Sequence, residues 1–330
     1  MKILVPIDFS AHAGGAMRMA MYLANRQRAS VAVLHVDPLP GLGTVAVEPI
    51  YIAPQMFAGL HAEHDARIDA ELAEVRTQYL ATAGDGVELA VVRRRDDVVP
   101  GILEFAREWQ PDLMVMGTGG IDGLGRLLLG STVDRVARVA PCPVLVAGRA
   151  DDTGDTPRRF ERVVAAIDYS AFSDPVARAA AAVVEPSGVL EFLHVWNPPH
   201  VSALSGSLGA DHVGMLGWIE RARAAQVDEI QSFSAELDCE HAAVAHYVGT
   251  GSPATGILER ARASRADLIV LGTHSRAGLA QRILGTVAER VLRHAEIPVL
   301  LCPLEAMPGL YRSTAGPTAA EVTTARRGLT

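Results

Sequence analysis

Lysine is almost missing from this chain of 330 residues. Lys2 is the only lysine, and the remaining 29 of the 30 basic residues are arginines. This shortage excludes the GxxxxGK[ST] loop of P-loop enzymes, the strand lysine of protein kinases and an interior lysine for Schiff-base chemistry. Any nucleotide must therefore be held by other groups.

Cysteines, long apolar runs and positive charge are also scarce. Cys142, Cys239 and Cys302 are far apart and form no CxxC motif, which fits neither a disulfide framework nor a zinc site. No apolar run approaches the ~20 residues that cross a bilayer, and Asp8 interrupts the apolar N-terminal stretch too early for a signal peptide. The net charge of −8 argues against a nucleic-acid partner. We therefore expect a cytoplasmic protein that binds neither membranes nor nucleic acids.

The chain does contain an internal repeat. Residues 101–146 align without a gap to residues 256–301, and 22 of these 46 positions are identical at a constant offset of 155. The match continues upstream in two short segments, IDFS at 7–10 with IDYS at 167–170, and LHV at 34–36 with LHV at 193–195. The chain is thus a tandem duplication.

Composition marks the borders of the two repeat units. Residues 150–160 are rich in Asp, Thr and Arg with a Gly and a Pro, which is typical of an exposed linker, and residues 304–330 have little to bury. We therefore predict one domain over 1–149, a linker over 150–160, a second domain over 161–303 and a mobile tail over 304–330.

Short apolar runs alternate with helical patterns in each unit. In the first unit we expect strands at 3–7, 30–36, 87–93, 112–117 and 143–147, and helices at 16–26, 59–81, 101–109 and 131–140. Strands that are apolar on both faces form a parallel sheet with helices on both sides. The predicted fold class is therefore α/β, with two tandem, doubly wound, parallel five-stranded sheets.

Candidate site residues gather where the first and fourth strands of each unit end. Ligands of an open parallel sheet bind at the carboxyl ends of its strands. Asp8 and Asp168 end the first strands, and Gly117 and Gly272 end the fourth. The glycine-rich stretch after Gly117 leads into a helix, and glycines with helix amides can hold a phosphate without lysine.

The start of that helix carries a capping-box pattern in both units. Ser131 precedes Asp134 by three residues, and Thr286 precedes Glu289 in the same way. We therefore expect Ser131 and Thr286 to cap their helices.

The spacing Gly117-xx-Gly120-x9-Gly130-Ser131 carries a specific resemblance. It is similar to the G-xx-G-x9-G-[ST] signature of the ATP-binding branch of the universal stress protein family, and with the flanking strands the match covers nearly all of each unit. The resemblance implies a Rossmann-like, adenine nucleotide alpha hydrolase-like fold with strand order 3-2-1-4-5. It also implies that the fifth strands, 143–147 and 298–302, pair to make an intramolecular pseudo-dimer, and it leaves open whether two chains form a homodimer.

The resemblance further implies which residues bind ATP, with or without Mg²⁺. The end of the first strand and the residue after the second strand's histidine would contact the adenosine, the strand-four glycine would lie near the ribose, and the last loop and helix start would hold the phosphates. In the first unit these are Ile7, Asp8, Val36, Gly117, Gly120, Gly130, Ser131 and Thr132. In the second they are Ile167, Asp168, Val195, Gly272, Ser275, Gly285, Thr286 and Val287.

Ser275 departs from the family pattern, which has its second glycine at this place. The Cβ of Ser275 would crowd a phosphate unless its hydroxyl donates to it, so we expect the first unit to hold the stronger site.

The function that the resemblance implies is that of a stress-response regulator, which binds nucleotide and presents an altered surface to an unidentified protein partner. Two alternatives stay open, a scaffold whose sites no longer bind nucleotide and a slow ATPase. Nothing marks a residue that would position the attacking water, so we assign no catalytic residue and no metal ligand.

Other polar clusters are interpreted as structural. His35 and His194 end apolar strands and are expected to be satisfied histidines of the core. The histidine pair within 61–64 lies on a solvated helical face rather than in a metal site. The arginines at 93–95 are expected to pair locally with the two aspartates that follow them.

Overall fold

The computed structural model describes residues 1–38, 54–118, 130–148, 159–196, 212–237, 239, 241–273 and 284–304. The expectations for Gly120, Ser275, linker residues 150–158 and tail residues 305–330 lie outside these ranges.

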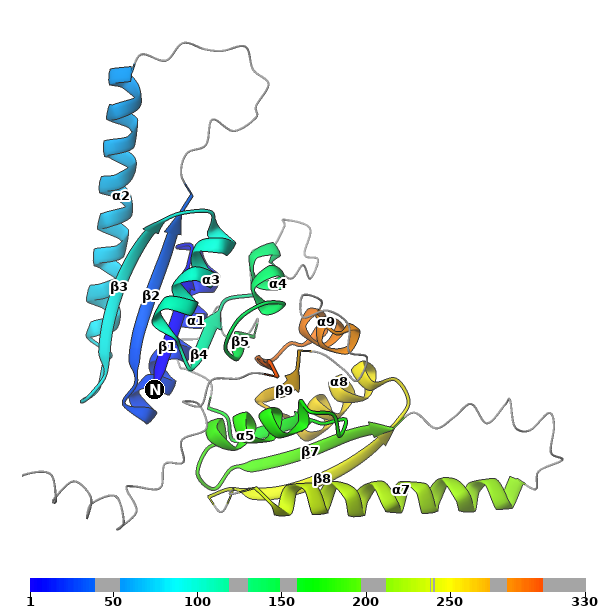
Figure 1. Ribbon diagram of the computed structural model, residues 1–330. Coiled ribbons are helices and arrows are strands. Elements are labelled where there is room, and N and C mark those ends of the chain that lie inside the picture. Colours follow the sequence, from blue (N-terminus) through cyan, green and yellow to red (C-terminus); the bar gives the residue numbers. More distant parts are fainter. Residues whose placement is uncertain are drawn as a thin grey trace, which may run out of the picture.

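Strands and helices alternate through both halves of the chain, as the apolar pattern predicts (Figure 1). The first half contains β1 (Lys2–Ile7), α1 (Ala11–Gln27), β2 (Ser30–Asp37), α2 (Pro54–Leu80), β3 (Glu88–Arg95), α3 (Val98–Trp109), β4 (Leu113–Met116), α4 (Ser131–Ala137) and β5 (Val144–Val146). The second half contains β6 (Arg162–Ala166), α5 (Ser173–Val183), β7 (Val189–Trp196), α7 (His212–Ala235), β8 (Ala243–Thr250), α8 (Pro253–Ser264), β9 (Leu268–Gly272), α9 (Thr286–His294) and β10 (Val299–Cys302).

These strands form one ten-stranded sheet in the order β3-β2-β1-β4-β5-β10-β9-β6-β7-β8. Within each half the pairs are parallel and follow the order 3-2-1-4-5, which confirms the predicted fold class. The halves meet where β10 pairs with β5 in the antiparallel direction. The two predicted five-stranded sheets are therefore halves of one continuous sheet.

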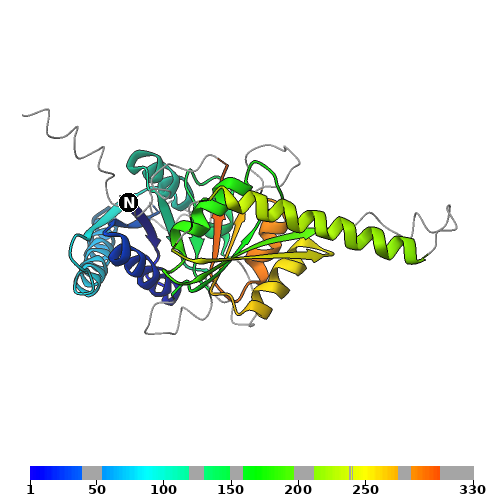
Figure 2. The ribbon, with the colours of Figure 1, turned by 90° about the horizontal axis from the view of Figure 1, so that it is seen from below.

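Helices cover both faces of the sheet, and successive strand residues contribute to opposite faces. Ile3 and Val5 pack with residues of α1, α2, α5 and α7 in one hydrophobic core. Leu4, between them, packs with residues of α3, α4, α8 and α9 in the other. The strands are apolar on both faces because both faces are buried. In Figures 1 and 2 the long helix α7 runs along its edge of the sheet and extends beyond the strands.

Helices also join the two halves beside the strand junction. Arg26, near the end of α1, donates hydrogen bonds to the carbonyl oxygens of Val183 at 2.7 Å and Val184 at 2.5 Å, at the end of α5. Arg26 also forms an ion pair with Glu185 at 3.2 Å. The last carbonyls of a helix have no partner within the helix, so an arginine from the other half satisfies them here.

The arginines at the end of β3 pair mainly with distant carboxylates. Arg94 reaches Asp96 at 3.7 Å, as the local interpretation predicts. Arg93 instead contacts Asp37 of β2 at 2.5 Å, together with Asp65 at 2.5 Å and Asp69 at 3.1 Å on α2. For Arg93 the expectation of local pairing was wrong, because the parallel sheet brings β2 and α2 beside it.

Among the described residues, no helix combines the length and the apolar character that crossing a bilayer requires.

Candidate functional site

The first strand of each half ends in an aspartate whose carboxylate is held by the following turn. Asp8 Oδ1 accepts a hydrogen bond from the backbone N–H of Ser10 at 3.0 Å, and Asp168 Oδ1 accepts one from Ser170 at 3.0 Å. In each half, the residue between the aspartate and the serine adopts a left-handed backbone conformation, with φ of 60° at Phe9 and 57° at Tyr169. Such values are uncommon for bulky residues and indicate that the surrounding structure holds the backbone in a disfavoured conformation.

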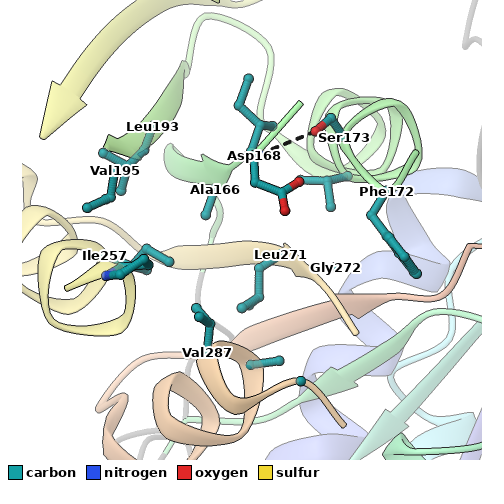
Figure 3. Close-up of a pocket in the computed structure, with 15 residues that line it drawn as sticks. Ala166, Asp168, Phe172, Ser173, Leu193, Val195, Ile257, Leu271, Gly272 and Val287 are labelled. Carbon is teal, nitrogen blue, oxygen red and sulfur yellow. Dashed lines mark hydrogen bonds between the residues drawn. The ribbon is translucent and has the colours of Figure 1, made fainter. Parts of the chain in front are cut away.

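A cavity of about 260 Å³ opens beside Asp168 in the second half (Figure 3). It lies at the carboxyl ends of β6, β7 and β9, which is where a sheet of this type binds ligands. Its lining residues are Ala166, Ile167, Asp168, Phe172, Ser173, Val176, Leu193, Val195, Pro253, Ile257, Leu271, Gly272, Gly285, Val287 and Ala288. The walls are largely apolar, and the Asp168 carboxylate and the Ser173 hydroxyl lie together on one side.

Most of the site residues expected in the second half meet in this cavity. Those that line it are Ile167, Asp168, Val195, Gly272, Gly285 and Val287. Thr286 is the first residue of α9, between two lining residues. Ser275 lies outside the described residues, so its effect on the site stays a prediction.

The position at the end of the fourth strand in each half requires glycine, because another part of the chain packs closely against it. A Cβ on Gly272 would lie 2.8 Å from Cβ of Phe172, and one on Gly117 would lie 2.6 Å from the carbonyl oxygen of His12. Both distances are shorter than real Cβ contacts allow. The absent side chain therefore lets the first helix of each half pack against the end of the fourth strand.

The helix that closes the site begins without a side-chain cap. Gly285, with φ of −60°, is the N-cap residue of α9, and Gly130, with φ of −56°, is that of α4. Among the residues that the structure describes, no side chain caps either helix, so the expected capping boxes at Ser131 and Thr286 were wrong. First-turn amides of a helix without a side-chain cap are available to an anion, and in α9 this turn borders the cavity.

The acidic residues of the expected capping boxes form ion pairs along their own helices. Asp134 pairs with Arg138 at 2.7 Å, and Glu289 pairs with Arg293 at 2.8 Å. Arg138, the C-cap residue of α4, also reaches Glu289 in the first turn of α9 at 4.0 Å, so this ion pair links the two halves.

The first half presents the same framework with different side chains. Ile7 and Val36 are buried and Asp8 is exposed at the carboxyl ends of β1 and β2. Gly117 lies just beyond the end of β4, and Gly130, Ser131 and Thr132 form the start of α4. The residues that differ at the lining positions are Pro6 for Ala166, His12 for Phe172, Ala13 for Ser173, Ala16 for Val176, Val98 for Pro253, Met116 for Leu271, Thr132 for Val287 and Val133 for Ala288.

Several residues of the cavity were missed in the sequence. Phe172 directly precedes α5, Val176 lies on it and Ile257 lies on α8, and their place in the wall depends on how those helices pack. Gly256 of α8 also matters, because a Cβ there would lie 3.0 Å from Cγ2 of Val195, a lining residue. Its counterpart Gly101 would place a Cβ 2.9 Å from Cγ1 of Val36. This contact could have been predicted from the glycine that occurs at the same helical position in both units.

The described residues hold no group of three or more His, Cys, Asp and Glu side chains that could bind a metal ion. Burial raises the pKa of the Cys142 thiol to about 12, and burial also raises the pKa of Cys302. A thiol must ionise to act as a nucleophile, so both cysteines are inert parts of the core.

Comparisons with known proteins agree with this architecture. A model of the universal stress protein family matches residues 1–148 and 159–303, and the chain therefore belongs to the universal stress protein family. It is 27% identical over 310 residues to a universal stress protein of Mycolicibacterium smegmatis, a match that covers 91% of this chain and 96% of the relative. It is also 30% identical over 153 residues to universal stress protein YxiE of Bacillus subtilis, covering 44% of this chain and 97% of YxiE.

Among solved structures, the fold resembles that of a universal stress protein from Archaeoglobus fulgidus, with a TM-score of 0.62 and 20% sequence identity. That match covers 92% of this chain and 98% of the other. At this level of identity the likeness shows the fold alone.

Proposed function

We propose that this chain is a cytoplasmic stress-response regulator that binds an adenine nucleotide, ATP in the first place, at the carboxyl ends of the strands in each half. The observation that carries the proposal is the cavity beside Asp168. Six of the eight residues expected to bind nucleotide in the second half, which lie far apart in the sequence, converge on its wall.

The chemistry of the cavity suits a nucleoside. Its apolar walls, with Val195 and Ile257, can bury the flat face of a purine, while the carboxylate of Asp168 can accept hydrogen bonds from ribose hydroxyls. The volume of about 260 Å³ is close to the lower end of ligand pockets, about 300 Å³. A nucleoside fits such a space, and the phosphates would extend toward the start of α9.

The phosphates would be held by backbone groups. The first-turn amides of α9 can donate to them, and the helix dipole adds about 0.3–1 kcal/mol of attraction for an anion. Mg²⁺ would then bind through phosphate oxygens, because the described residues hold no metal-binding group of their own. The nucleotide would act by ordering this end of the sheet, which changes the surface offered to a protein partner.

Calorimetry with paired glycine variants tests the proposal. Gly130 and Gly285 have φ values that any residue can adopt, so Gly130→Val and Gly285→Val add bulk without straining the backbone. We expect wild-type protein to bind ATP, each single variant to lose about half of the binding sites, and the double variant to lose binding. Gly217→Val is the control, because α7 contributes no residue to the cavity wall, and it should bind as wild type does.

Acid extraction of the purified protein, followed by chromatography, gives an independent measurement and should release adenine nucleotide. A wild-type protein that produces no heat with ATP and releases no nucleotide would refute the proposal. Full binding by the double variant would show that the nucleotide binds elsewhere.

A further inference from the structure

A histidine at the end of the second strand contacts the backbone that carries the aspartate. His35 Nδ1 lies 3.0 Å from the carbonyl oxygen of Ile7, and His194 Nδ1 lies 2.9 Å from that of Ile167. A carbonyl oxygen can only accept, so Nδ1 carries the hydrogen in both rings. Each bonded carbonyl belongs to the residue immediately before the aspartate, so the imidazole holds one flank of Asp8 or Asp168.

The same imidazole supports the other flank through an aromatic ring. The ring of Phe9 lies 4.4 Å from that of His35, and the ring of Tyr169 lies 4.7 Å from that of His194, measured between centroids. These are the aromatic residues with left-handed backbones that directly follow the aspartates. The packing of the aromatic ring on the histidine helps to maintain a conformation that the backbone alone disfavours.

The histidine also fixes the opposite wall of the cavity. Val195, which follows His194, lines the cavity, and Val36 follows His35 at the same place in the first half. Both histidine residues are only 8% exposed, so their side chains have little freedom to turn. One side chain thus connects the aspartate on the first strand to the valine on the second.

We propose that His35 and His194 are positioning residues of the two nucleotide sites, which set the distance and direction between the aspartate carboxylate and the valine wall. This inference rests on the proposed nucleotide binding. The two halves differ at eight of the fifteen lining positions, His12 for Phe172 among them, yet they share the bonded carbonyl, the left-handed aromatic residue and the buried imidazole. Core packing alone would not require that these three features occur together twice.

Two double variants of the full chain separate positioning from general stability. His35→Leu/His194→Leu removes the donor, whereas His35→Asn/His194→Asn keeps a side-chain N–H near the place of Nδ1. We expect the leucine variant to bind ATP at least about tenfold more weakly, the value of one hydrogen bond to a buried carbonyl, and the asparagine variant to recover most of this loss.

His241, an exposed residue, provides a control for the loss of such a hydrogen bond away from the cavity. Its Nε2 lies 3.1 Å from the carbonyl oxygen of Ala181, the same kind of bond in a turn before β8, at the end of the sheet opposite the cavity. His241→Leu should lower the melting temperature and leave the affinity for ATP unchanged. A purely structural role for His35 and His194 would give all three leucine substitutions this same result.

The outcomes distinguish this inference from the function beneath it. Wild-type protein without ATP binding refutes the proposed function, and the positioning role fails with it. Wild-type binding with an unchanged affinity in the leucine variant, or with equal losses in the leucine and asparagine variants, overturns the positioning role alone. If the leucine variant does not fold, ¹⁵N-histidine NMR of the wild type decides: ATP should shift the signals of His35 and His194 but not that of His241, and unshifted signals at both would overturn the inference.

Discussion

Leu145 of β5 lies directly opposite Leu300 of β10 in the antiparallel pair at the centre of the sheet. The two side chains are 1% and 0% exposed and belong to the same hydrophobic core, which extends through both halves. All other strand pairs in the described part of the sheet are parallel, so the direction of the repeat reverses at this pair. The junction between the two halves is therefore part of a shared hydrophobic core, not a contact between two separately folded domains.

Shortening one leucine of this pair should destabilise the whole chain. Leu300→Ala leaves a cavity at the junction, and we expect the free energy of unfolding to fall by about 2–5 kcal/mol. Leu304→Ala is the control, because Leu304 is 49% exposed, and it should change stability by less than about 0.5 kcal/mol. Urea unfolding followed by far-UV circular dichroism measures both, and equal effects of the two substitutions would contradict a buried junction.

The helical glycine against the site wall should not tolerate a methyl group. A Cβ on Gly101 would lie 2.9 Å from Cγ1 of Val36 and 3.0 Å from Cβ of Asp96. Gly101→Ala should therefore destabilise the protein by about 1–3 kcal/mol and displace Val36, although alanine favours helix. Gly14→Ala on α1 meets only the flexible end of Arg18 at 3.3 Å and should stabilise by about 0.5–1 kcal/mol. Thermal unfolding tests the opposite signs, and a stabilised Gly101→Ala protein would disprove the tight contact.

The duplication and the parallel sheet were predictable because they depend on repeated local patterns. The positions of Asp8 and Asp168 followed for the same reason, since strand ends can be located from apolar runs. The start of α1 at Ala11 was missed, because Gly14 and Gly15 interrupt the helical pattern that begins clearly at Ala16.

Features that depend on distant contacts could not be predicted. The N–H of Gly130 donates to the carbonyl of Thr118 at 3.0 Å, and that of Gly285 donates to Thr273 at 2.7 Å. In both helices the N-cap residue is this glycine, one residue before the Ser131 or Thr286 that the capping-box pattern indicated. The wall contributed by Phe172 depends in a similar way on the packing of α5 against β9.

A buried ion pair in the second half has an apolar counterpart in the first. Glu191 of β7, 6% exposed, accepts hydrogen bonds from Arg260 at 2.6 and 2.7 Å, and Arg260 lies 4.1 Å from the ring centre of Tyr247. In the repeat, Ala32 and Phe105 occupy the positions of Glu191 and Arg260.

Removing one partner of the Glu191–Arg260 pair should lower the free energy of unfolding far more than removing both. Arg260→Met leaves the buried carboxylate of Glu191 without its cation, and we expect a loss of about 3–5 kcal/mol in the free energy of unfolding. The double variant Glu191→Ala/Arg260→Phe introduces the residues of the first half and should lie within about 1.5 kcal/mol of wild type. Chemical unfolding of both variants provides the test, and a single variant as stable as the double one would show that the pair is not effectively buried.

The carboxylates around Arg93 should make stability depend on acid pH. Burial opposes ionisation of Asp37, but hydrogen bonds from Arg93 and His64 outweigh it and lower its pKa. Hydrogen bonds from Arg95 and Arg93 lower the pKa of Asp65 to about 2. Both values lie below those of the unfolded chain, near 3.9. Their contribution to stability is therefore complete above about pH 5 and is lost as the pH falls toward 2.

Asp65→Asn isolates one of these titrations. The variant should be less stable than wild type at pH 7, because the asparagine cannot pair with Arg93 and Arg95 as an anion. The difference in stability between variant and wild type should shrink steadily between pH 5 and pH 2. In this range wild-type Asp65 becomes protonated and loses its charge, whereas asparagine does not titrate. Urea midpoints at pH 7, 5, 4 and 3 measure this difference. A difference that stays constant over this range would mean that the charge of Asp65 does not stabilise the fold.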